Sequence, residues 1–396
     1  MLRPYSRVLR TPGILLPFLA TFAGSLSIGM LGLAILLFAH ARTGSLGVAG
    51  VIAGLYSAGN ALGLVVQGRF IDRRGQTVVL VPAAVLSATA LLVLVLGPAA
   101  PVAIGLCALI AGVCVPATIT AMRTLIPEIL PDEQRRTTAY ATLAVLFSVA
   151  TLLGSLVVSG LLTLVGSTGA ILVGGGLASG GGLAFAGTPA SRAWKPPRRH
   201  ATGGRLIERG MRTLLVSAAG LGFCSGLTGI GIPALAIDRG AASLAALFFA
   251  VASIGDLLSG FGYGIRHWKM PKTNQLIFAL CAASVVALCV ASATQSLTLL
   301  FPLLFFGGAV GAPAGITTSA LLDGVARRGA ITQSYAALVC VGLLSGSAGN
   351  ALGGVLADTA GTRLLFLANG LGLAAVAGWT YLRRRTLVER KLLTSA

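Results

Sequence analysis

The chain consists of long apolar runs separated by short polar connections. In the first half the runs lie near residues 13–38, 45–67, 77–97, 102–124, 138–161 and 168–187. In the second half they lie near residues 213–236, 242–265, 274–293, 297–321, 333–356 and 363–382. A helix needs about 20 residues to cross the hydrocarbon core of a bilayer, and each run is long enough. The pattern therefore predicts an all-α integral membrane protein with twelve transmembrane helices.

Composition makes lipid the expected solvent. Apolar residues account for 56% of the 396 and charged residues for 10%, with a mean hydropathy of +0.92. A soluble protein of this length needs far more charged surface. The first run follows Arg3, Arg7 and Arg10, as a signal-peptide core would, but it is about twice as long as such a core. We therefore expect it to stay as a membrane span.

The basic residues predict the orientation. A formal charge of +19 on a soluble protein would suggest a nucleic-acid partner. Here the 29 Lys and Arg residues avoid the interiors of the apolar runs and gather in every second connection. With both termini cytoplasmic, only Arg42, Arg239 and Arg363 lie outside. The positive-inside rule then predicts a multi-pass protein of the cell membrane with cytoplasmic termini, and nucleic acid is rejected as a partner.

The longest connection divides the chain into two halves. It contains Pro196-Pro197 and Gly203-Gly204, which favour irregular structure with at most a short amphipathic helix near 206–211. The prediction is a bundle over 1–187, a basic cytoplasmic linker over 188–212 on the anionic lipid leaflet, and a second bundle over 213–396.

An internal repeat relates the halves at a nearly fixed offset. Gly59-Asn60 recurs as Gly255-Asp256, 196 residues later. The segment 116–120 matches 313–317 at an offset of 197, and Tyr140-Ala141 matches Tyr335-Ala336 at 195. Markers that keep one register predict a duplicated unit of six helices and hence two pseudo-symmetric bundles.

A parallel six-plus-six repeat is typical of transporters whose bundles rock about a site at the membrane midplane. An enzyme inside the membrane would need several catalytic groups, whereas the apolar runs contain one acidic residue, Asp256. The six cysteines form no C-x-x-C pair. We therefore expect a transporter that is no enzyme and has neither a metal site nor a cofactor.

The connection after the second run carries the most specific motif. Gly68-Arg-Phe-Ile-Asp72-Arg73-Arg74-Gly75 fits the pattern G-x-x-x-D-[RK]-x-G and resembles the major facilitator superfamily, with Gln76-Thr77 in place of the following basic pair. The segment 123–139 is also similar to that family, and 327–361 resembles its actinobacterial members. The resemblance covers essentially the whole chain and implies the major facilitator fold.

The resemblance gives the motif a gating role. The Asp72 carboxylate would accept hydrogen bonds from a helix N-terminus of the other bundle, and Arg73 and Arg74 would pair with acids of the next cytoplasmic connection: Glu128, Asp132 or Glu133. Contacts made in one state alone would bias the conformational equilibrium. The alternative is a tight turn that carries positive-inside charge.

Two further polar positions come from a seven-residue identity. Residues 57–63 and 347–353 are both Ser-Ala-Gly-Asn-Ala-Leu-Gly. In the family fold the two helices face each other, so Asn60 and Asn350 are candidates for a hydrogen bond at the bundle interface. Ordinary packing of small residues is the equal alternative.

The family's central cavity is lined mainly by the first, fourth, seventh and tenth helices. The residues near their middles are hydroxyls, aromatics and one thiol: Phe22, Ser25, Thr118, Cys224, Ser225, Thr228, Phe306 and Thr317. A charged substrate would require a fixed countercharge, so this set favours a neutral or lipophilic compound.

Asp256 is the candidate for proton coupling. A lone carboxyl group at membrane depth is costly to ionise and should face protein or water, where it can take up and release a proton. Its repeat partner is the neutral Asn60, so a structural role is an equal alternative, and direct substrate contact is a third. The arginine and proline motifs of the family's proton-coupled drug antiporters are missing from the fourth and fifth runs.

The leading hypothesis is a proton-coupled exporter of a small neutral or lipophilic drug or secondary metabolite. The alternative is an importer or facilitator of a neutral nutrient, which needs no titrating group. A sensor or scaffold built on a transporter fold is the remote alternative.

Overall fold

The computed structural model describes residues 11–97, 100–130, 132–195, 209–240, 243–265, 268–325 and 331–387. These residues form helices, turns and short connections, with no strand among them. The helices of the first half are α2 (Leu15–Thr43), α3 (Leu46–Arg74), α4 (Gln76–Leu96), α5 (Pro101–Cys114), α6 (Thr118–Ile129), α7 (Glu133–Leu164), α8 (Gly166–Gly187) and the short α9 (Pro189–Ala193). They correspond to the six runs of the first half.

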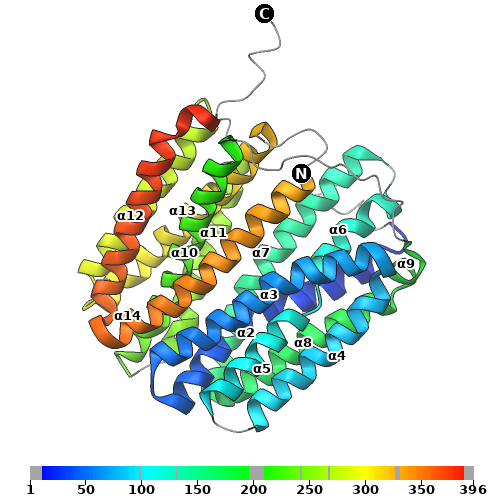
Figure 1. Ribbon diagram of the computed structural model, residues 1–396, viewed down its shortest axis with the longest axis horizontal. Coiled ribbons are helices and arrows are strands. Elements are labelled where there is room, and N and C mark those ends of the chain that lie inside the picture. Colours follow the sequence, from blue (N-terminus) through cyan, green and yellow to red (C-terminus); the bar gives the residue numbers. More distant parts are fainter. Residues whose placement is uncertain are drawn as a thin grey trace, which may run out of the picture. The chain divides into compact units, whose positions relative to one another are not determined.

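The second half has fewer but longer helices. They are α10 (Arg209–Ile237), α11 (Ser243–Ile265), α12 (Lys272–Ser292), α13 (Leu297–Val325) and α14 (Ile331–Leu382), followed by a short 3-10 helix (Arg384–Leu387). Helix α14 bends at Gly361, where φ is 78° and ψ is 167°, and Figure 1 shows its orange and red limbs meeting at this bend. The two limbs are the last two predicted spans. The described residues contain 11 helices that could cross a membrane, so counting these limbs separately confirms twelve spans.

Contacts between residues divide the chain into two compact units. Unit 1 comprises Met1–Gly44 and Leu55–Arg199, and unit 2 comprises Ser45–Gly54 and His200–Ala396. Helix α3 is therefore shared, because its first turns contact residues of unit 2 and the rest contacts unit 1. Each unit has its own apolar core, with Phe18, Leu80 and Phe185 in unit 1 and Leu214, Leu280 and Leu322 in unit 2.

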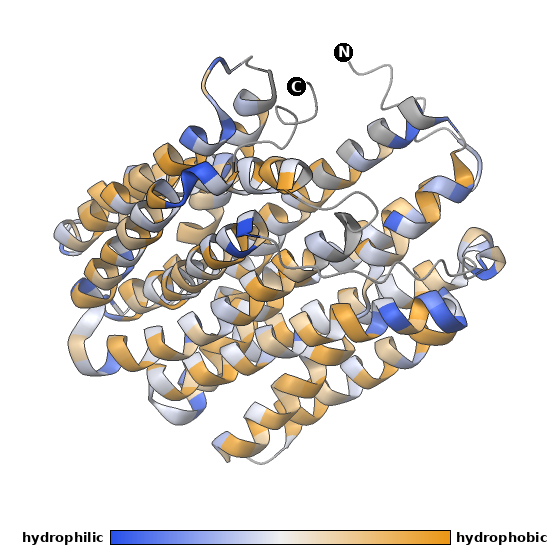
Figure 2. Ribbon diagram, turned by 45° about the horizontal axis from the view of Figure 1, so that its top comes forward, coloured by the Kyte–Doolittle hydropathy of each residue, from blue (hydrophilic) through white to orange (hydrophobic). Residues whose placement is uncertain are grey.

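Large apolar side chains are exposed on the surface of the helices. Figure 2 shows hydrophobic colours along the helices and hydrophilic colours mainly near their ends. Large apolar side chains such as Leu16, Val102 and Phe278 are more than 60% exposed. Contact of so many large apolar side chains with water is unfavourable, so lipid must cover this surface.

The first repeat marker, Gly59-Asn60 and Gly255-Asp256, lies at close helix crossings. A Cβ on Gly59 would collide with the carbonyl oxygen of Leu109, and one on Gly112 with that of Tyr56. Unit 2 contains the same reciprocal pair 196 residues later, since Gly255 meets the carbonyl oxygen of Phe305 and Gly308 meets that of Ala252. Helices α3 and α5 therefore cross as α11 and α13 do, at backbone contact.

A second reciprocal pair joins α2 to α7 and α10 to α14. A Cβ on Gly29 would lie 2.6 Å from the Thr151 carbonyl oxygen, and one on Gly154 would meet Leu26. In unit 2, Gly226 meets the carbonyl oxygen of Gly346 and Gly349 meets that of Phe223. The glycines thus serve helix packing, because small residues let helix backbones approach closely in lipid.

The run at 102–124 lies in one candidate membrane span, as predicted, but this span consists of two helices. It breaks between α5 and α6 at Pro116, which lacks a backbone N–H. Gln67 supplies the missing partners, because its Nε2 donates to the carbonyls of Val113 and Val115 at 2.8 Å and its Oε1 accepts from the Ala117 N–H at 3.0 Å. The equivalent helix α13 contains Pro313 and stays continuous.

The predicted amphipathic segment 206–211 is described only in part. Residues 206–208 lie outside the described residues. Arg209 to Met211 form the first turn of α10, which therefore begins four residues before the predicted span at 213.

Candidate functional site

The gating motif forms the end of α3 and the turn to α4. Gly75 separates the two helices with φ at 97°, a conformation that favours glycine, and its N–H donates to the Ile71 carbonyl at 2.9 Å. Asp72, Arg73 and Arg74 are exposed in the last turn, and the Arg74 guanidinium lies 5.5 Å from the centre of the Phe70 ring. The motif therefore presents three charged groups at one helix end.

Gln76 and Thr77, which replace the usual basic pair, connect α4 to its neighbours. Gln76 is buried, and its Nε2 donates to the Ala121 carbonyl and the Thr124 hydroxyl, both at 3.0 Å. Thr77 donates to the Ala186 carbonyl at 3.2 Å. The departure from the motif thus fixes α4 against α6 and α8, a role that the sequence did not indicate.

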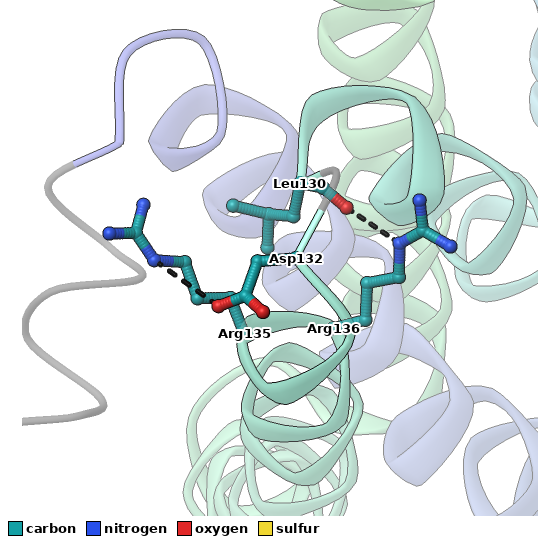
Figure 3. A network of polar contacts seen from close by, with 4 residues as sticks. All are labelled: Leu130, Asp132, Arg135 and Arg136. Carbon is teal, nitrogen blue, oxygen red and sulfur yellow. Dashed lines mark hydrogen bonds and ion pairs between the residues drawn. The ribbon is translucent and has the colours of Figure 1, made fainter.

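The connection between α6 and α7 forms a polar network of its own (Figure 3). Asp132 pairs with Arg135 one turn later at 3.7 Å. Arg136 donates from Nε to the Leu130 carbonyl at 2.6 Å and from Nη2 to that of Pro127 at 3.2 Å, which closes the end of α6. Of the acids predicted to pair with Arg73 and Arg74, Asp132 thus has a local partner, Glu128 is exposed, and the Glu133 side chain lies outside the described part.

Asp256 lies in α11, nine residues before Ile265 and thirteen after Ser243. At the helical rise of 1.5 Å per residue it is roughly 14 Å from one end and about 20 Å from the other. The side chain is half-buried against α13: a Cβ on Gly311 would lie 3.1 Å from Oδ1, and the backbone of Ala312 hydrogen-bonds to the carboxylate. The carboxylate thus contacts the residue that precedes Pro313 in α13.

The eight cavity candidates differ in exposure. Those with buried side chains are Ser25, Thr118, Cys224 and Thr317; those half-buried are Phe22 and Thr228; those exposed are Ser225 and Phe306. The hydroxyls of Ser25 and Thr317 donate to carbonyls of their own helices, at 2.8 Å to Thr21 and 2.6 Å to Pro313. In this conformation the candidates whose side chains are not buried are therefore Phe22, Ser225, Thr228 and Phe306.

Two cavity candidates belong to a network within unit 2. Asn369, 2% exposed in the second limb of α14, donates from Nδ2 to the Thr228 hydroxyl at 2.9 Å. The Cys224 thiol lies 3.8 Å from the Asn369 carbonyl oxygen. Sequence reasoning missed Asn369, because an isolated asparagine in an apolar run shows no periodic signal.

The two interface asparagines lie in different units. The backbone of Asn60 faces Gly112 of α5, and the backbone of Asn350 faces Gly50 and Gly226. A Cβ on Gly229 would lie 3.0 Å from the Asn350 amide oxygen. Each asparagine therefore occupies a close helix crossing in its own unit.

Comparison with known proteins decides the family. The family model described as "Major Facilitator Superfamily" matches residues 17–347. The chain belongs to this superfamily. The superfamily is one of transporters, which fits the absence of a catalytic cluster predicted from the sequence.

Solved structures with the same fold cover nearly the whole chain. The crystal structure of the nucleoside transporter NupG aligns with a TM-score of 0.74 and 14% identity, over 93% of this chain and 99% of its own. A POT family transporter in complex with a thioalcohol-conjugated peptide gives 0.75 and 12%, over 95% and 97%. A bacterial homolog of the human lysosomal transporter Spinster gives 0.73 and 14%, over 94% and 96%. These identities establish the fold alone.

No curated protein matches the sequence of this superfamily member.

Proposed function

We propose that this transporter works by alternating access and exports a small neutral or lipophilic compound in exchange for protons. The observation that carries the proposal is the combination of an uncharged cavity set with one membrane-embedded carboxylate. Residues 13–38, 102–122, 213–237 and 297–322 contain no Lys, Arg, Asp or Glu, which disfavours a charged substrate. Asp256 supplies the one group at this depth that can exchange a proton.

The second candidate function is a facilitator or importer of a neutral nutrient. It is favoured by the repeat, since the position equivalent to Asp256 holds Asn60 in the same helix crossing. A neutral amide there shows that the fold accepts an uncharged polar group at this place.

Growth of a drug-hypersensitive bacterial host separates the two candidates. Expression of the chain should protect the host against some members of a panel of neutral amphiphilic compounds, and an uncoupler should remove the protection. Protection that survives the uncoupler contradicts proton exchange. Absence of protection against every compound favours the facilitator.

Asp72→Asn is expected to slow transport by about tenfold at normal expression. The substitution removes an exposed charge that we propose contacts a helix N-terminus in one state only, so it shifts the equilibrium between states and leaves the core intact. Initial transport rates in vesicles, normalised to protein, measure the effect. Asp238→Asn is the matched control, since it removes an exposed acid outside the gating motif and its proposed partners. Equal rates for Asp72→Asn and the unmodified protein would show that Asp72 is no gate.

The proposed orientation predicts one-sided labelling. In a chain whose six cysteines are replaced, Arg192→Cys should react with a membrane-impermeant maleimide from the cytoplasmic side only, and Thr43→Cys from outside only. Arg192 is a better reporter than its neighbour Ser191, which is 1% exposed. Labelling of Thr43→Cys from the cytoplasmic side would invert the topology.

A further inference from the structure

The Asp358 carboxylate caps the first turn of α3. Asp358 lies in α14, three residues before the bend at Gly361. Asp358 and the first turn of α3 both belong to unit 2. Its Oδ1 accepts the Leu46 N–H at 2.9 Å. Its Oδ2 accepts the Gly47 N–H at 2.7 Å and the Ser45 hydroxyl at 2.6 Å. Ser45 in turn accepts the Val48 N–H at 3.1 Å, as an N-cap residue does.

The contact joins complementary charges. The first N–H groups of a helix have no partner within the helix and carry a partial positive charge, so a carboxylate there makes short charge-assisted bonds. Residue 47 must be small, because a Cβ on Gly47 would already lie 3.1 Å from Asp358 Oδ2. One side chain of α14 therefore accepts hydrogen bonds from the first N–H groups of α3.

The first turns of α3 and the first limb of α14 otherwise pack backbone against backbone. A Cβ on Gly50 would lie 2.7 Å from the Asn350 carbonyl oxygen, and one on Gly54 would lie 2.8 Å from that of Ser347. A Cβ on Gly354 would collide with the Leu46 carbonyl oxygen. Backbones that meet through glycine interlock few side chains, and Asp358 adds three hydrogen bonds to this packing.

We propose that Asp358 is a latch that holds the first turns of α3 on α14 in one state of the transport cycle and releases them in the other. The inference rests on the alternating-access cycle proposed above. Helix α3 is shared, since 45–54 contact unit 2 and the residues from Leu55 onward contact unit 1. A segment held on one unit by the Asp358 hydrogen bonds and by backbone packing, and continuous with a helix of the other, is placed to be released when the units move.

Hydration partly offsets the loss of the Asp358 hydrogen bonds when this contact opens. Asp358 is exposed, so its carboxylate and the freed N–H groups regain water when the contact opens. Asp72 lies at the other end of the same helix, about 40 Å away at the helical rise. Helix α3 thus has one carboxylate at each end, and alternating access requires that the two ends be closed in turn.

A distance measurement tests the latch without any substrate. Spin labels are attached at Val51→Cys, in the held segment, and Leu371→Cys, in the second limb of α14, after the six native cysteines are replaced. Both sites are exposed, so the labels are tolerated. Electron–electron double resonance should show a main distance and a minor second one in the otherwise unmodified chain.

Asp358→Asn should raise the ratio of the second population to the first by about tenfold, because the amide has one acceptor oxygen and no charge. Ser45→Ala removes one of the three bonds to the carboxylate, together with the N-cap bond to Val48, and should raise the ratio by roughly threefold. Asp238→Asn is the matched control: it removes an exposed acid whose carboxylate accepts the Thr362 hydroxyl at 3.1 Å beside Gly361, without touching α3. Its ratio should stay unchanged.

An unchanged ratio in Asp358→Asn, or a broadened main distance without growth of the second, would reduce Asp358 to a helix cap and overturn the latch. An equal shift in Asp238→Asn would overturn it too. If Asp358→Asn does not fold, Ser45→Ala decides in the same way. The proposed export fails independently: a population shift with no compound transported refutes export and keeps the latch.

Discussion

Gly255→Ala is expected to reduce the ratio of folded to unfolded protein by about thirtyfold, equivalent to roughly 2 kcal/mol of overpacking. A Cβ at this position collides with the Phe305 carbonyl oxygen and lies 3.0 Å from the Ala309 nitrogen, and both are rigid backbone atoms. Helices α11 and α13 must therefore separate to admit one methyl group. Thermal unfolding in detergent, followed by the amount of monodisperse protein in size-exclusion chromatography, measures the loss.

Gly262→Ala is the matched control in the same helix, since nothing lies within 4 Å of a Cβ there. It should be neutral or slightly stabilising, because alanine favours the helix more than glycine does. Adding Gly308→Ala to Gly255→Ala should cost less than the two single changes together, since both force the same separation. Equal stability of Gly255→Ala and Gly262→Ala would contradict backbone contact at this crossing.

The sequence predicted what depends on local pattern. Apolar runs of membrane length gave twelve spans because lipid imposes length and composition on every crossing segment. The repeat was visible for the same reason, since Gly59 and Gly255 occupy equivalent crossings where a side chain collides with backbone. Duplicated geometry leaves duplicated glycines, so the six-plus-six architecture could be inferred before the structure.

The sequence could not predict contacts between distant polar residues. Gln67 and the break at Pro116 are nearly fifty residues apart, and Pro313 in the equivalent helix causes no break. Asp358 and Leu46 are 312 residues apart, and an acid at the end of a run looks like ordinary loop chemistry. The cavity candidates stay predictions for a related reason. Helical position alone does not tell whether a side chain faces a cavity, and the Thr317 hydroxyl donates to the carbonyl of Pro313 in its own helix.

Asp256→Asn is expected to abolish concentrative, proton-driven transport while downhill exchange and folding persist. The carboxylate lies roughly 14 Å from the nearer helix end, where an ionised group is costly and exchange of a proton with a cavity offsets the cost. It hydrogen-bonds to the backbone of Ala312, the residue before Pro313, and it lies beside Gly311. The proline leaves this turn of α13 one backbone N–H short, so loss or gain of a proton acts on a turn that lacks one helical hydrogen bond.

The measurement uses proteoliposomes with an imposed pH difference and a substrate identified in the growth assay. Asp256→Asn preserves shape and one acceptor oxygen, so the fold should tolerate it as it tolerates Asn60 at the equivalent crossing. Asp256→Glu should restore part of the coupling, because it keeps the proton-exchanging group and shifts its position by one methylene. Asp238→Asn, which removes an exposed acid at the end of α10, should leave coupling intact. If Asp256→Asn still moves substrate against its gradient, the carboxylate has the structural role that its repeat partner suggests, and protons enter the cycle elsewhere or not at all.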